Sequence, residues 1–151
     1  MELDKAKRYI FRLLKFRIRT ESEITQRLRK KGFTEKIIEE LIRYFKDANL
    51  INDSLFASQW LNERLNRGYG IERIKWELKQ KGISEEYIQE LIAKNEVLEK
   101  ENDMLYKVMK EKIKKIDPNL ESFKKKAILY RYLIQRGFSQ SKVLGIIENY
   151  F

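Results

Sequence analysis

The sequence predicts an all-α protein, organised as a tandem array of three three-helix repeats that is elongated and curved. Three observations predict this fold. The 151 residues include one Pro and six Gly, so few positions interrupt helices. Apolar residues recur at helical spacing along the whole chain. One pattern also occurs three times, and each copy is too small to bury its apolar face alone, so neighbouring copies should pack in series.

The first repeat is expected over residues 1–50. It opens with an amphipathic helix, and Thr20-x-x-Glu23 then forms a capping box that starts a second helix. Gly32 ends that helix, because glycine readily takes the left-handed conformation found after a helix C-terminus. Thr34 is placed to cap a third helix with a continuous apolar stripe.

The second repeat is expected over residues 51–93, and a shift of 50 residues superimposes it on the first. Asp53 is the expected N-cap of its first helix. Gly68 and Gly70 flank an aromatic residue and predict a tight turn before the second helix, which Gly82 ends.

The third repeat is expected over residues 94–151, where a further shift of 55 places Gly82 on Gly137. Its first helix should be long, running over residues 94–116 until Asp117-Pro118 ends it. A short coiled coil is the alternative for this segment. We favour an elongated first helix, because the apolar positions do not keep a regular heptad.

Charge favours a polyanionic partner, since the formal net charge is +10. Basic residues outnumber acidic ones by 14 to 8 in residues 1–50 and by 12 to 8 in residues 96–151, whereas residues 51–95 hold seven of each. The chain has no apolar run long enough to span a membrane, no signal-peptide pattern and no Cys. We therefore expect a cytoplasmic protein that does not engage membranes and acts as a monomer.

An enzyme is not expected, and neither is a cofactor or a metal. The chain has no His and no Cys, which are the commonest general base and a common nucleophile. The acidic pairs Glu39/Glu40 and Glu85/Glu86 have the spacing of solvated helix surface.

DNA contacts are expected from the second helices rather than the third. The third helices expose acidic residues, which phosphates repel, so sequence-specific reading of the major groove is disfavoured. Basic residues recur instead on and beside the second helices, and a solvated face with internal ion pairs is the alternative interpretation. In the outer repeats the candidates for DNA binding are Arg17, Arg19, Arg27, Lys31, Lys124, Lys125, Lys126, Arg131 and Arg136.

The run from Arg64 to Gly82 reads Arg-x-x-Arg-Gly-Tyr-Gly-x-x-Arg-Ile-x-x-Glu-Leu-x-x-Lys-Gly. It closely resembles the central repeat of the RecX family, bacterial modulators of the RecA recombinase, and the likeness extends over nearly the whole chain. Ile71 departs from the family, which often has Pro there, and Leu55 stands where an Arg is common.

The resemblance implies a protein that binds the RecA–DNA filament and modulates it, with inhibition of ATP hydrolysis and strand exchange as the expected direction. The distributed basic residues, with no recognition helix, predict single- and double-stranded DNA as partners, bound without sequence specificity. The residues assigned to contacts with RecA and DNA are Arg64, Arg67, Tyr69, Arg73, Lys75, Lys79 and Lys81.

Two other functions stay open from the residues alone: a sequence-independent nucleic-acid-binding helical-repeat protein, and a protein–protein adaptor. Two aromatic features also have more than one interpretation. Tyr69 is either an exposed contact or, as we favour, a plug between helices. Trp60 and Trp76 are expected in the core or between repeats.

Overall fold

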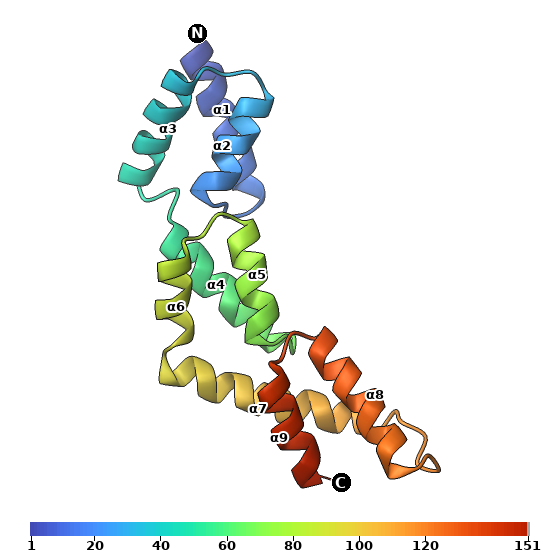
Figure 1. Cartoon of the computed structure of the whole chain (residues 1–151). Helices are drawn as coiled ribbons and strands as arrows, with labels where there is room; N and C mark the ends of the chain where they lie inside the picture. Colours follow the sequence, from blue (N-terminus) through green and yellow to red (C-terminus); the bar gives the residue numbers. More distant parts are fainter. Residues whose placement is uncertain (151) are drawn as a thin grey trace.

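Nine α-helices follow one another along residues 1–150, the part of the chain that the computed structural model describes. Figure 1 shows them in three successive groups from the N-terminal to the C-terminal end, with α7 lying across the end of the second group. The predicted all-α repeat array is confirmed. The helices are α1 (Glu2–Phe16), α2 (Glu21–Lys30), α3 (Glu35–Asp47), α4 (Asp53–Asn66), α5 (Ile71–Gln80), α6 (Glu85–Ile92), α7 (Asn95–Ile113), α8 (Ser122–Gln135) and α9 (Gln140–Tyr150).

Local sequence sets most helix starts as predicted, with one exception. The Thr20 hydroxyl accepts a hydrogen bond from the Glu23 N–H at 3.1 Å, and the Glu23 carboxylate accepts one from the Thr20 N–H at 3.4 Å, which completes the capping box. Thr34 caps α3 through its hydroxyl. Asp53 is not the N-cap of α4: Asn52 holds that position, and the Asp53 carboxylate binds elsewhere.

The same turn ends the second helix of every unit. Gly32, Gly82 and Gly137 have φ values of +91°, +84° and +100°, in the left-handed region that glycine enters without a steric penalty. In the turn at Gly82, the N–H of Ile83 donates to the carbonyl of Leu78 at 3.1 Å, which is the longer bond of a Schellman motif. The three turns thus repeat one backbone conformation.

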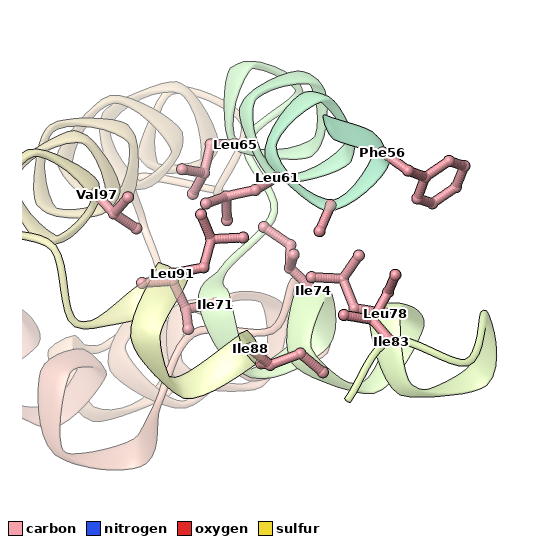
Figure 2. Close-up of a cluster of buried hydrophobic side chains, with 11 residues drawn as sticks. Phe56, Leu61, Leu65, Ile71, Ile74, Leu78, Ile83, Ile88, Leu91 and Val97 are labelled. Atoms are coloured by element: carbon pink, nitrogen blue, oxygen red, sulfur yellow. The ribbon is translucent and has the colours of Figure 1, made fainter. Parts of the chain in front are cut away.

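Each unit has its own apolar core. Figure 2 shows the middle core, in which side chains of α4, α5 and α6 point toward one another between the three helices. Full burial of one Leu or Ile stabilises a fold by about 1.5–3 kcal/mol, so, within residues 1–150, the 11, 10 and 7 buried apolar residues of the middle, first and third cores supply most of the driving force. The central positions of the three cores are filled by Ile24, Leu28 and Phe45, by Ile74, Leu78 and Ile88, and by Leu129, Leu133 and Phe138.

The third unit begins inside the core of the second. Val97, near the start of α7, is 7% exposed and packs with Leu61, Leu65 and Leu91 of the middle core (Figure 2). Further along α7, Leu105 and Met109 belong to the third core. The long helix therefore joins two units as one continuous element. We propose unit boundaries at residues 1–50, 51–93 and 94–151, with α7 shared in this way.

Candidate functional site

Three guanidinium groups surround the ring of Tyr69, which lies in the turn between α4 and α5. The guanidinium carbons of Arg64, Arg136 and Arg73 lie 4.0, 4.2 and 4.4 Å from the ring centroid. A cation over an aromatic face is attracted to the ring by about 0.5–2 kcal/mol, depending on how far solvent is excluded. Tyr69 is partly buried. It is a plug rather than an exposed contact, and it joins the second unit to Arg136 of the third.

One carboxylate neutralises much of this cluster. Glu77 of α5 accepts two hydrogen bonds from Arg64, at 3.0 and 2.7 Å, and a third from the indole N–H of Trp60 at 3.1 Å. The side chains of Arg64 and Glu77 are only 14% and 12% exposed. A two-point guanidinium–carboxylate pair of this kind is both strong and orienting. Arg64 is therefore committed to holding α4 on α5.

Two of the predicted arginines remain open to solvent beside this network. Arg67 is 63% exposed and pairs with Glu63, one turn earlier on α4. Arg73 is 41% exposed, and its Nε lies 3.6 Å from Glu77. The Arg67–Glu63 pair is exposed on both sides, and such pairs contribute about 1 kcal/mol or less, so the Arg67 guanidinium can exchange partners at little cost. Arg73 keeps an exposed side chain, although its partner Glu77 is largely buried.

The three predicted lysines of the middle unit occupy different surroundings. Lys75 and Lys79 are paired with Glu72 and Glu85, at 3.7 and 2.7 Å. Lys81 lies 4.8 Å from the Trp60 ring, with its Nζ 4.0 Å from Glu23 of the first unit. Lys81 thus belongs to the contact between units.

Trp76 is the aromatic residue that the sequence interpretation misplaced. It is 63% exposed on α5 and does not belong to the middle core. The buried stripe of α5 is Ile71, Ile74 and Leu78. A residue two positions after Ile74 lies about 200° around the helix, on the opposite side. Trp60 fits the expectation, because it packs against the middle core.

The junction between the first and second units joins the start of α2 to the turn after α5. The Thr20 hydroxyl donates to the carbonyl of Lys81 at 2.7 Å, and the Glu21 N–H donates to the Asp53 carboxylate at 2.8 Å. A Cβ on Gly82 would overlap the side chain of Ser22. The close approach of the two backbones therefore requires glycine.

The junction between the second and third units repeats this arrangement. Here the start of α5 meets the turn after α8: the N–H of Gly70 donates to the carbonyl of Arg136 at 2.8 Å, and that of Glu72 to the carbonyl of Gly137 at 3.0 Å. A Cβ on Gly137 would overlap that of Arg73. The carboxylate that Asp53 supplies at the first junction is supplied here by Glu101 of α7, which accepts a hydrogen bond from the Ile71 N–H at 2.6 Å.

Equivalent positions thus carry equivalent contacts. Glu21 and Ile71 are 50 residues apart, and each has its N–H bound by a carboxylate from the first helix of the next unit. Glu101 is 2% exposed and is also paired with Lys142 of α9. Sequence analysis missed Asp53 and Glu101 in this role, because neither stands in a local pattern that identifies its partner.

The pKa values of three groups at the first junction are shifted by burial and by neighbouring charges and hydrogen bonds. Burial alone would raise the pKa of Glu23, but hydrogen bonds from Arg17 and the charge of Lys81 outweigh it and lower that pKa. Burial lowers the pKa of Arg19, and the charges of Arg17 and Arg27 add to this effect. Burial raises the pKa of Asp53, against the hydrogen bond that it accepts from Glu21.

The candidate residues of the outer units do not converge on one site. Arg17 and Arg19 lie beside Glu23 at the first junction, and Arg136 is part of the second. Arg27 and Lys31 line an open cleft of the first unit together with Tyr9. On α8, Lys124 and Arg131 are exposed, whereas Lys125 and Lys126 are partly buried.

Within residues 1–150, no group of three or more acidic side chains is arranged to hold a metal ion. None of the helices described has the length and apolar character needed to cross a bilayer.

Comparisons with known proteins agree with this geometry. The family described as RecX, second three-helix domain, matches residues 52–92, and the family described as RecX, first three-helix domain, matches residues 6–45. The chain belongs to the RecX family. Regulatory protein RecX of Clostridium perfringens (strain 13 / Type A) is 31% identical over 150 residues, which cover 97% of this chain and 69% of that protein. Regulatory protein RecX of Haemophilus influenzae (strain PittEE) is 30% identical over 143 residues, covering 92% and 90%.

Solved structures of RecX proteins share the fold. The crystal structure of RecX from Lactobacillus salivarius aligns with a TM-score of 0.84 at 22% identity, over 98% of this chain and 96% of that one. A second crystal structure, of a regulatory protein RecX, aligns with a TM-score of 0.81 at 24% identity, over 98% and 73%. Membership of the family supports a regulatory role for this chain.

Proposed function

We propose that this chain binds the RecA–DNA filament and suppresses its ATP hydrolysis and strand exchange, without chemistry of its own and without a cofactor. The observation that carries the proposal is membership of the RecX family, through two of its three-helix domains. RecX-family membership supports a regulatory role, and the geometry of the array suggests how a filament could be contacted.

An elongated array suits a partner that extends in one direction. The three units follow one another rather than closing into a ball, and α7 alone, with 19 residues, is about 28 Å long at 1.5 Å per residue. We infer that the array contacts more than one subunit of the filament. The excess of basic residues at both ends favours phosphate contacts there, and these carry no sequence information.

The middle unit is the proposed protein-facing part. Arg67 and Arg73 have side chains that are 63% and 41% exposed, and Trp76 presents an exposed indole on the same helix as Arg73. Tryptophan and arginine are the residues most often found at the energetic centres of protein interfaces. We propose Arg67, Arg73 and Trp76 as direct contacts. Arg64 and Tyr69 act indirectly, by holding them in place.

The test compares two sets of charge reversals, in filament-dependent ATPase and naked-DNA binding assays. Arg67→Glu with Arg73→Glu should abolish suppression of the ATPase and leave most naked-DNA binding intact. Reversal of Lys124, Lys125 and Lys126 should weaken DNA binding and reduce its salt slope by about 0.9 for each phosphate that is no longer neutralised. Arg64 is kept unchanged, because its reversal would remove both hydrogen bonds that it donates to the largely buried Glu77.

Equal loss of both activities in both variants would refute this division of roles and favour a uniform electrostatic coat. The alternative function, nucleic-acid binding alone, draws support from the cationic cleft of the first unit. Equal affinity for naked DNA and for the filament would select it. Binding to a protein alone, insensitive to charge, would select an adaptor.

A further inference from the structure

The first unit carries one half of a junction that has no partner within the described residues. In the second and third units, the turn after the second helix docks on the preceding unit through Gly82 and Gly137. Gly32 stands at the equivalent position of the first unit, with the same left-handed backbone. A Cβ added to Gly32 would meet nothing within 4 Å, whereas one added to Gly82 or Gly137 would overlap the neighbouring unit.

The residue that follows each of these glycines is also buried in the second and third units and more exposed in the first. The apolar residue after the docked turns is buried, with Ile83 5% exposed and Phe138 2% exposed. Its counterpart Phe33 is only partly buried and lines an open cleft with Lys31 and Tyr9. The surface that meets a preceding unit elsewhere in the array is therefore exposed at the N-terminal end. We call Lys31, Gly32 and Phe33 the open turn.

We propose that the open turn docks the start of an α-helix belonging to a protein subunit of the filament. This inference rests on the proposed function, which supplies the partner. Both internal junctions show what this turn accepts: the first residues of a helix, with a hydroxyl or N–H donor at the N-cap that reaches the carbonyl of Lys81 or Arg136. The matching acceptor on the open turn is the carbonyl of Lys31.

Charge specifies the occupant further. At the first junction, the basic residue of the turn, Lys81, faces a carboxylate in the first turn of the docked helix, Glu23. Lys31 is the equivalent residue, and the cleft beside it adds the basic side chains of Lys5, Arg8 and Arg12. A helix start with a small residue and a carboxylate in its first turn matches this surface, since negative charge is also favoured at a helix N-terminus.

A second copy of this chain is a poor match for the same surface. The unpaired helix start at the other end of the array is that of α8, which carries Lys124, Lys125 and Lys126 in its first turns. Lysines there would face Lys31, so like charges oppose a head-to-tail contact between copies.

The decisive variant blocks the open turn without changing any charge. Gly32→Asn adds a side chain where docking needs none, and Asn tolerates the left-handed backbone better than other non-glycine residues. We expect at least a tenfold loss of affinity for the RecA–DNA filament, with unchanged affinity and salt slope on naked DNA. Gly145→Asn, at an exposed position of α9 with open space around it, should bind the filament like the wild-type chain.

A charge pair provides a second comparison. Lys31→Glu should weaken filament binding more than Lys30→Glu, although both remove one cation from the same cleft and should weaken naked-DNA binding equally. Thermal melting confirms that each variant is folded.

The outcomes separate this inference from the proposed function. Equal filament affinity for Gly32→Asn and the wild-type chain overturns the docking of the open turn and leaves the function standing. A wild-type chain that does not bind the filament overturns both. Sedimentation showing oligomers that Gly32→Asn dissolves would identify a second copy as the occupant and refute the proposed one.

Discussion

Replacing Gly137 by Ala isolates the free energy of docking between the second and third units, because Gly32→Ala provides a matched control. Both glycines occupy the same turn with similar positive φ values, so Ala has the same backbone penalty at either site, about 1–2 kcal/mol. Only at Gly137 does the new Cβ meet another unit. It would lie 2.9 Å from the backbone nitrogen of Arg73 and overlap its Cβ, where ordinary contact begins at 3.4 Å.

The excess penalty at Gly137 can be derived from the contacts that must lengthen. Arg73 is part of α5, so its Cβ cannot swing aside, and the turn must move away from the helix. That movement stretches the Glu72–Gly137 and Gly70–Arg136 hydrogen bonds, each worth about 0.5–1.5 kcal/mol. It also moves Arg136 away from Tyr69, a contact worth about 0.5–1 kcal/mol. The excess is therefore about 1.5–4 kcal/mol.

Thermal melting and amide hydrogen exchange measure this effect. At about 2–4 °C for each kcal/mol in a protein of this size, Gly137→Ala should melt roughly 3–16 °C below Gly32→Ala. The N–H groups of Gly70 and Glu72 should lose protection in Gly137→Ala alone, since they bond across the junction. Equal melting temperatures, with unchanged exchange at both amides, would refute the proposed docking energy.

Three further variants test other parts of the structure. Glu101→Gln should lower the free energy of unfolding, measured by chemical denaturation, by about 1–3 kcal/mol, because it removes a buried carboxylate that is bound to the Ile71 N–H and to Lys142. The control Glu99→Gln, on the exposed side of α7, should leave that free energy unchanged. Glu23→Gln should reduce the loss of unfolding free energy that the wild-type chain shows as the pH is lowered. The folded-state pKa of Glu23 lies below its ordinary value of 4.5, so the ionised carboxylate stabilises the fold above pH 4.5. This stabilisation is lost as the pH falls through the folded-state pKa. Trp76→Ala should leave the free energy of unfolding within about 0.5 kcal/mol and weaken filament binding at least tenfold, and unchanged binding would remove Trp76 from the interface.

Local signals in the sequence were sufficient for the helices and the repeat. The capping box at Thr20 and the turns at Gly32 and Gly82 depend on residues close to one another in the sequence, so they can be predicted without knowledge of the tertiary structure. The exposed position of Trp76 could also be predicted, because a residue two positions after Ile74 lies on the side of the helix opposite the buried stripe. Periodicity, rather than hydrophobicity, therefore decides the position of this side chain.

Contacts between units could not be predicted in the same way. The Ile71–Glu101 hydrogen bond joins residues 30 positions apart, and the Arg136–Gly68 hydrogen bond joins residues 68 apart. Such partners depend on the angle at which one unit meets the next, which apolar periodicity does not specify. For the same reason, the arginines of the central motif looked alike in sequence, although Arg64 is largely buried against Glu77 and Arg67 is open to solvent.

The difference between these arginines bears on how the motif acts. Tyr69 and Arg64 have most of their interactions within the protein, and Gly70 permits an approach of two backbones that a Cβ would prevent. These residues hold the second and third units together, whereas Arg67 and Trp76 are exposed and are proposed to contact a partner. An array that meets several filament subunits needs both, since a contact residue is effective only when the units are held at matching spacing. Loss of function after mutation at Gly70 would therefore indicate a changed angle, and loss at Arg67, Arg73 or Trp76 with the angle preserved would indicate a direct interaction with the filament.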